Sequence, residues 1–342
     1  SRPVVALKEA ADQVAAGDLG VQVEVQSRDE IGHLADSFNR MTEGLRERDR
    51  IKNTFKRYLA PDVVDYLLAN PEAQSPGGER RRLTMLFSDL AGFTTFSEAH
   101  SPEQVVGVLN EYLGLISDQL VVRGGTLDKY MGDGVMAFFG APLPREDHAM
   151  GAVLAALDHL DVVNQVNVQL EKAGMPLLRV RVGLHTGDVI CGNIGGEQAQ
   201  DYTVIGDAVN LAARLEGVNK AYRTSILVSE DVWQEVAEEF DGREIDSVRV
   251  KGKTEAVRIY EVLGVAGWFA EHPGKAAVVE RFNEGLVAYR DARFEAAQAA
   301  FSAALALDSS DGPSRVFLAR SERLVAEPPG ESWSPVWTLT SK

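Results

Sequence analysis

Two aspartates each end a short apolar run at a tight turn: Asp89 within residues 85–94 and Asp133 within residues 129–139. A carboxylate at the end of a buried strand is held rigidly and still faces solvent. Taken alone, each aspartate is more often a turn residue that caps its own backbone. Two such groups brought together, however, make a hard-oxygen site for Mg²⁺ or Mn²⁺, the ions of nucleotide chemistry.

Four motifs follow one another along the chain: FSDLAGFT (87–94), DKYMGDGVMAFFG (128–140), GLHTGDV (183–189) and VNLAARLE (209–216). From about Arg82 to Val262 the chain therefore resembles a class III nucleotidyl cyclase domain, with the motifs in the family's order and spacing. The resemblance implies that Asp89 and Asp133 bind two divalent metal ions, Mg²⁺ or Mn²⁺. It also implies that Lys129 recognises the base.

The resemblance assigns the remaining site residues as well. Asn210 and Arg214 match the pair that orients the substrate and steadies the transition state, and Lys251 resembles a triphosphate-contacting lysine. Thr203 stands where many adenylyl cyclases have aspartate. This replacement resembles the subclass called IIIb, several members of which respond to bicarbonate, so we count bicarbonate as a candidate effector.

The residue types suit the reaction without the family name. Forming a cyclic nucleotide means deprotonating the 3′-hydroxyl and driving it onto the α-phosphorus, and two metals at Asp89 and Asp133 would assist both steps. Arg214 offers a planar fork for phosphate oxygens. It follows Asn210 by four residues, so the two share one face of a helix. A surface ion pair is the commoner role of a lone arginine.

Base selection follows from donors and acceptors. Adenine N1 accepts and its N6 amine donates, so the Lys129 ammonium suits N1 and the Thr203 hydroxyl can accept from N6. Guanine reverses this pattern, and buried polar pairing can reject the wrong partner by roughly 10⁴-fold. Threonine is a weaker acceptor than carboxylate, so we expect ATP to be selected with less margin. Thr203 could instead simply favour a strand, as β-branched residues do.

Composition limits the class of protein. A formal net charge of −16 argues against a nucleic-acid partner, since that role carries a basic footprint. The single cysteine, Cys191, excludes an internal disulfide framework and fits a reducing compartment. No histidine pair has metal-ligand spacing, so zinc is not expected. No stretch reaches eighteen apolar residues, and we expect no membrane span in this chain.

The N-terminal segment, residues 1–48, resembles a HAMP signalling domain, with Arg2-Pro3 at its entry and Asp29-Glu30-Ile31-Gly32 opening the second helix. Ser27 with Glu30 forms a capping-box signal. Apolar residues then step by 3 and 4, the heptad seam of a parallel coiled coil: Ile31, Leu34, Phe38, Met41 and Leu45. Because HAMP units usually follow a membrane helix, we expect a membrane or sensor module before Ser1 and a location at the cytoplasmic face of the membrane.

Residues 49–81 are expected to form a coiled-coil transducer helix and a linker. From Leu45 to Ile51 the heptad breaks by one residue, and such a phase change alters local winding. Its position suits the transmission of a twist to the catalytic pair. Residues 74–82 are polar and rich in Gly and Pro, which is typical of a linker.

Within residues 82–264, strands and helices alternate, which predicts an α+β sandwich with one central mixed sheet. The expected strands include 83–88, 135–139, 178–185 and 188–194, and a helix is expected over 207–220. After a linker at 264–275, residues 275–342 are expected to form a helical tail with one tetratricopeptide-like repeat. A single copy cannot bury its own face, so we favour docking on the neighbouring domain over an independent binding module.

Together these features predict a homodimeric adenylyl cyclase controlled by a HAMP coil. By resemblance, Asp89 and Asp133 of one protomer meet Lys129, Thr203, Asn210 and Arg214 of the other, giving two equivalent sites. A guanylate cyclase is disfavoured by Lys129, and the Gly-Gly-Asp/Glu-Glu-Phe signature of diguanylate cyclases is absent. A signalling scaffold without catalytic activity is the alternative from outside the enzymes, and the intact site residues argue against it.

Overall fold

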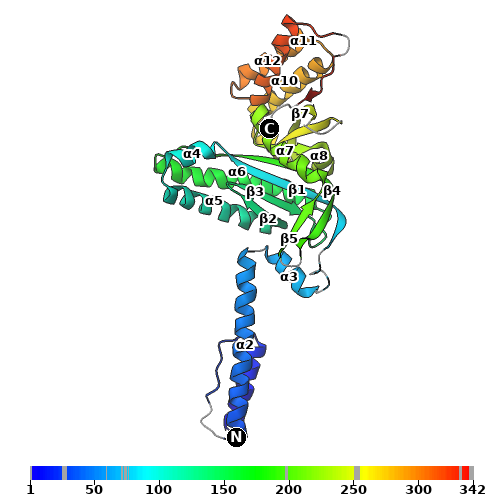
Figure 1. The fold of residues 1–342 in the computed structure, drawn as a ribbon. Coiled ribbons are helices and arrows are strands. Elements are labelled where there is room, and N and C mark those ends of the chain that lie inside the picture. Colours follow the sequence, from blue (N-terminus) through cyan, green and yellow to red (C-terminus); the bar gives the residue numbers. More distant parts are fainter. Residues whose placement is uncertain are drawn as a thin grey trace. The chain divides into compact units, whose positions relative to one another are not determined.

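A computed structural model of the chain divides into two compact units, Ser1–Ala69 and Asn70–Lys342. Each unit is described by itself (Figure 1). The described residues are 2–24, 29–58, 60–70, 72, 75, 77–196, 199–249, 255–330 and 333–338.

The first unit contains three helices, α1 (Arg2–Ala15), α2 (Glu30–Tyr58) and α3 (Pro61–Ala69), in its described part. Asp29 Oδ1 accepts hydrogen bonds from the backbone N–H groups of Ile31 and Gly32, at 3.0 and 3.2 Å, and so caps α2. Ser27, the predicted cap, lies outside the described residues. Helix α2 runs without interruption through the predicted phase break between Leu45 and Ile51.

The predicted heptad seam separates into two sets. Ile31 and Phe38 pack within the protomer against a small core that includes Leu7 and Ala10 of α1. Leu34 and Met41 remain 54% and 51% exposed, and Leu45 is exposed as well. Exposed apolar residues at this spacing are what a second parallel helix would cover.

The second unit is built on one mixed sheet in the order β2-β3-β1-β4-β6-β8-β7-β9, with β5 paired to β4. Most neighbouring strands are antiparallel, whereas β4 pairs with β6 and β7 with β9 in parallel. The strands are β1 (Gly77–Ala91), β2 (Gly125–Met131), β3 (Gly134–Phe139), β4 (Arg179–Gly196), β5 (Ala199–Ile205), β6 (Ile226–Ser229), β7 (Phe240–Arg249), β8 (Val257–Val265) and β9 (Trp337–Thr338). This mixed sheet with helices confirms the predicted fold class.

Helices cover both faces of the sheet (Figure 1). Strand β1 alternates between two cores: Leu86 and Leu90 pack with α5 and α6, and Met85 and Phe87 pack on the other face, where α7 lies. The helices of this part are α4 (Phe93–Ala99), α5 (Pro102–Val122), α6 (His148–Lys172), α7 (Asp207–Tyr222) and α8 (Glu230–Val236).

Helix α5 is, among the described residues, the one helix whose length and composition would allow it to cross a membrane. This differs from the prediction of no such segment. Tyr112, Ile116 and Leu120 of α5 are fully buried in the core of the sheet, as in the core helix of a folded domain.

Strand pairing overrides two local expectations. Strand β1 begins at Gly77 rather than at Leu83, so part of the predicted linker is strand, and β4 continues through the break expected near Gly187. The reason is an unbroken antiparallel ladder from Gly77↔Asn193 to Ala91↔Arg179, which satisfies the backbone groups on both strands. Strand β5 was not predicted.

The C-terminal helices are α9 (Trp268–Glu271), α10 (Pro273–Arg290), α11 (Phe294–Leu307) and α12 (Gly312–Ala326). The predicted linker at 264–275 is therefore largely helical. Phe282, Phe301 and Phe317 of these helices share one buried core with Leu215 and Tyr222 of α7. The C-terminal helices therefore dock on the neighbouring domain, while their likeness to a tetratricopeptide repeat stays a prediction.

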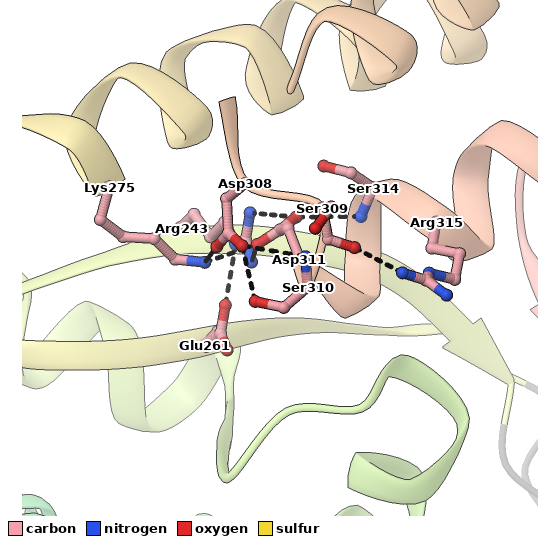
Figure 2. A network of polar contacts seen from close by, with 9 residues as sticks. All are labelled: Arg243, Glu261, Lys275, Asp308, Ser309, Ser310, Asp311, Ser314 and Arg315. Carbon is pink, nitrogen blue, oxygen red and sulfur yellow. Dashed lines mark hydrogen bonds and ion pairs between the residues drawn. The ribbon is translucent and has the colours of Figure 1, made fainter. Parts of the chain in front are cut away.

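A buried polar network fixes these helices to the sheet (Figure 2). Arg243 on β7 contacts Glu261 on β8 at 2.8 Å and both carboxylate oxygens of Asp311 at 2.7 and 3.1 Å. Lys275 Nζ donates to the same Asp311 at 2.6 Å. Burial alone would raise the pKa of Asp311, but the Arg243 guanidinium holds it well below its usual range.

A second buried group joins α12 to α7. Arg320 donates to Asp246 at 2.6 Å and to the Tyr222 hydroxyl at 3.1 Å, while that hydroxyl donates to Asp246 at 2.5 Å. The Arg320 guanidinium also lies 3.8 Å from the ring centroid of Trp337, which belongs to the edge strand β9. The C-terminal helices therefore hold the end of α7 as well as β7.

We predict that Asp311→Ala lowers the free energy of unfolding by about 3–5 kcal/mol, because removing one member of a buried ion group leaves the others uncompensated. Glu284→Ala is the matched control: it breaks the exposed Arg281–Glu284 pair and should cost less than about 1 kcal/mol. Urea denaturation followed by circular dichroism measures both. Equal losses would contradict a structural role for the network.

Candidate active site

Asp89 and Asp133 are brought together at the end of β1. Asp133 lies in the two-residue turn between β2 and β3, where Gly132 has a φ of 70°, a conformation that favours glycine. The backbone N–H of Leu90 donates to Asp133 Oδ2 at 3.2 Å. Burial first, and then the negative charge of Asp89, raise the pKa of Asp133 to about 6. A divalent cation at this position would relieve both effects.

Arg181 and Glu216 extend this carboxylate pair. Asp89 and Arg181 are direct cross-strand partners in the β1–β4 ladder, and Arg181 Nη2 donates to Asp89 Oδ2 at 2.5 Å. The other side of the guanidinium lies 3.0 Å from Glu216 Oε1 on α7. Burial is the main cause that raises the pKa of Glu216 to about 7. Sequence reasoning singled out neither residue, since the cross-strand register identifies Arg181 only once the sheet is known.

Lys129 and Thr203 are joined by a residue that the sequence did not single out. The Thr203 hydroxyl donates to Asp128 Oδ2 at 2.5 Å, and Lys129 Nζ lies 3.2 Å from Asp128 Oδ1. Lys129 is on β2 and Thr203 on β5, so two segments far apart in sequence meet at this carboxylate. The two predicted base-recognising residues thus lie together in one chain.

Asn210 and Arg214 lie one turn apart near the start of α7. Leu211 and Leu215 bury the opposite face of the helix, which leaves Asn210 exposed and Arg214 half-buried. Neither side chain has a hydrogen-bond or ion-pair partner within the part of the chain that the structure describes. An unpaired arginine in so acidic a chain is available to bind an anion.

Helix α7 is held in place by a close approach to the sheet. A Cβ atom at Gly183 would lie 2.1 Å from the backbone nitrogen of Glu216, so only glycine at this position lets α7 pack so tightly on β4. Asn210 and Arg214 on α7 are thereby fixed relative to the strands. Lys251, the predicted triphosphate contact, lies outside the described residues.

The site residues form two groups in one chain. One contains Asp89 and Asp133, and the other contains Lys129 and Thr203 around Asp128. Among the described residues, no hydrogen bond or ion pair joins the first group to the second. Each group offers only part of what a nucleotide needs: oxygen ligands for cations, or donors and acceptors for a base.

Known proteins provide the comparison. Residues 78–264 match the model of the adenylate and guanylate cyclase catalytic domain, and residues 1–47 match the HAMP domain. The adenylate cyclase of Anabaena cylindrica is 38% identical over 77% of this chain. The chain spans 54% of the length of that relative.

Two solved structures are similar in fold. The guanylyl cyclase Cya2 is 38% identical and covers 56% of this chain and 95% of its own, with a TM-score of 0.52. The adenylyl cyclase CyaB from P. aeruginosa is 35% identical and covers 54% of this chain and 95% of its own, with a TM-score of 0.51. The chain described here belongs to the adenylate and guanylate cyclase catalytic domain family and carries a HAMP domain before its cyclase domain.

Proposed function

We propose that this chain is an adenylyl cyclase, which converts ATP to 3′,5′-cyclic AMP and pyrophosphate at sites shared by two copies of the chain. The observation that carries the proposal is the pair of carboxylates, Asp89 and Asp133, held together at the end of β1 in a cyclase catalytic domain. The residues around this pair suggest how the reaction proceeds.

Asp89 and Asp133 fit two divalent metal ions, Mg²⁺ or Mn²⁺. Among the described residues there is no cluster of three or more metal-ligating side chains. This agrees with a substrate-bridged site, because Mg²⁺ commonly binds through one or two carboxylates together with phosphate oxygens and water. When bound, such ions lower the pKa of the ribose hydroxyl and neutralise phosphate charge.

In the reaction, the 3′-oxygen of the ribose forms a bond to the α-phosphorus as its proton passes to solvent water. The bond from the α-phosphorus to the oxygen that bridges to the β-phosphate breaks, and pyrophosphate leaves with that electron pair. Arg214 offers a rigid, doubly donating fork for the phosphate oxygens, where charge develops. Asn210, on the same face of α7, orients the substrate.

We assign base recognition to Lys129 and Thr203. The Lys129 ammonium donates to adenine N1, and the Thr203 oxygen accepts from the N6 amine. Their common contact with Asp128 supports a joint role. By resemblance, Lys251 adds a contact to the triphosphate.

We place each site between two protomers, with Asp89 and Asp133 from one and Lys129, Thr203 and the α7 pair from the other. The absence of a direct contact between these groups within the described chain supports this arrangement. So do the exposed apolar side chains beside them, Tyr130, Met131 and Ile205. An isologous pairing gives two equivalent sites.

Cyclisation of GTP is the second candidate, because the guanylyl cyclase Cya2 has the same 38% identity to this chain as the Anabaena adenylate cyclase, although it covers 56% of the chain rather than 77%. Lys129 argues against it: guanine N1 is a donor and would face the ammonium, also a donor. A scaffold without activity is a weaker alternative, since Arg214 has no hydrogen-bond or ion-pair partner among the described residues and is available to bind an anion.

Regulation is assigned to the first 48 residues, the HAMP signalling domain, acting through residues 49–81 on the catalytic domain at 82–264. The exposed Leu34 and Met41 support a two-stranded coil. Since HAMP domains commonly follow a membrane segment, we propose a membrane or sensor module before residue 1 and a location at the cytoplasmic face of the membrane. Bicarbonate is an effector suggested by Thr203 alone.

Product analysis tests the activity directly. The purified chain, given ATP or GTP with Mg²⁺ or Mn²⁺, should form cyclic AMP much faster than cyclic GMP, because Lys129 and Thr203 complement adenine. Chromatography of the products measures both rates. Predominant cyclic GMP would establish the second candidate. Absence of product with either metal would favour the scaffold without activity.

Mixing two inactive variants tests the shared site. Asp89→Ala and Arg214→Ala should each be inactive alone, but their heterodimer should regain about half of the wild-type rate, because one of its two sites carries neither change. As a control, Asp89→Ala mixed with Asp133→Ala should stay inactive, since every site then lacks one carboxylate. No recovery after verified subunit exchange would place each site within one chain.

The coil is tested by changing its phase. One residue inserted between Leu45 and Ile51 rotates the downstream helix by roughly 100° and should change turnover several-fold, as should deletion of residues 1–48. Insertion of a whole heptad keeps the phase and should leave turnover close to wild type. Rates are compared at protein concentrations where all variants are dimers. Unchanged turnover in the first two variants would mean that the coil only holds the two protomers together and does not control activity.

A further inference from the structure

The side chain of Asp128 is almost fully enclosed in the candidate base site. Its side chain is 1% exposed, whereas that of neighbouring Lys129 is 45% exposed. Burial raises the pKa of Asp128, and the hydrogen bond from Thr203 and the charge of Lys129 oppose that shift. A carboxylate so enclosed cannot reach a nucleotide itself, so any effect on the substrate passes through its two partners.

A β-bulge accounts for its position. In the β2–β3 pairing, Leu127 opposes Ala137 and Lys129 opposes Met136, which leaves Asp128 as the extra residue. In a regular strand, adjacent side chains point to opposite faces of the sheet. The bulge re-aims one of them, so Asp128 and Lys129 can contact each other and Thr203 on β5 can reach the carboxylate.

The contact fixes the direction of one hydrogen bond. A threonine hydroxyl has one proton to donate and two lone pairs with which to accept, and an ionised carboxylate only accepts. Because the Thr203 proton is directed at Asp128 Oδ2, the oxygen can offer only lone pairs to a ligand. The Thr203 oxygen can then accept a hydrogen bond from an amino group. It can form none with a carbonyl oxygen, because both atoms are acceptors.

We propose that Asp128 is a specificity-determining positioning residue, which selects adenine over guanine by holding the Thr203 hydroxyl in its accepting orientation. Adenine has an amino group at position 6, and guanine has a carbonyl there. Asp128 also tethers the Lys129 ammonium, the donor for adenine N1. This inference rests on the proposed cyclase function and adds to it the residue that sets the base.

The test is a change of selectivity in the full chain. Asn has the shape of Asp but can donate its amide hydrogen to the Thr203 oxygen, which frees the threonine proton for a carbonyl. Asp128→Asn should lower the ratio of kcat/KM for ATP to that for GTP by about tenfold or more. In a Thr203→Val background, the same substitution should change the ratio by less than about threefold, since the hydroxyl it acts through is gone.

Asp201→Asn is the matched control. Asp201 is an exposed carboxylate on β5 whose charge also acts on Asp128, so the variant removes a nearby negative charge without touching the hydroxyl. It should leave the ratio within about twofold of wild type. An unchanged ratio in Asp128→Asn, an equal effect in Asp201→Asn, or an undiminished effect without the Thr203 hydroxyl would each overturn the proposal.

A substrate analogue keeps the proposal testable if Asp128→Asn does not fold. Purine riboside triphosphate retains N1 but lacks the 6-amino group, so the wild-type protein should use it about tenfold less well than ATP. Thr203→Val should use the two equally. Equal use by the wild-type protein would overturn the proposal, while absence of any product from ATP would instead refute the cyclase function itself.

Discussion

The antiparallel ladder between β1 and β4 is the interaction on which the rest of the second unit depends. It runs the whole length of β1 and sets Asp89 opposite Arg181. The same β4 then pairs with β5 and places Gly192 opposite Thr203. Side chains alternate along a strand, so a slip of one residue would move Met85 to the face that Leu86 now occupies, and Leu86 to the face of Met85. It would also move Asp89 away from Arg181. One register therefore positions both groups of site residues.

Much of the fold could be predicted from the sequence where local pattern and tertiary structure agree. The helix predicted over 207–220 matches α7, and the aspartate turns mark the ends of β1 and β2. The prediction of a break near Gly187 was wrong, because the partner strand β1 stabilises a conformation that glycine alone would not favour. The separation of Ile31 and Phe38 from Leu34 and Met41 could not be foreseen either, since a heptad pattern does not say which helix covers each position.

The sequence singled out residues that the structure brings together, but not the contacts between them. Asp89 and Asp133 do lie together at the end of β1, and Asn210 and Arg214 do share a helix, whereas their roles stay predictions. Asp128 escaped notice because its position depends on a bulge, which no local pattern specifies, and because a charged residue beside a lysine suggests an ordinary ion pair. Arg181 and Glu216 depend on register and on the approach of α7 at Gly183. These features arise from pairings between distant segments.

The buried charges of β7 bear on where this protein can be divided. The match to the cyclase catalytic domain ends at residue 264, yet Arg243 and Asp246 lie before that point while Asp311 and Arg320 lie after it. A fragment cut at the family boundary would keep Arg243 with Glu261 but without Asp311, and would leave the buried carboxylate of Asp246 without the Arg320 guanidinium, together with an uncovered apolar side of Tyr222. The segment that recombination could move as one folded unit therefore extends beyond residue 264 and includes α12.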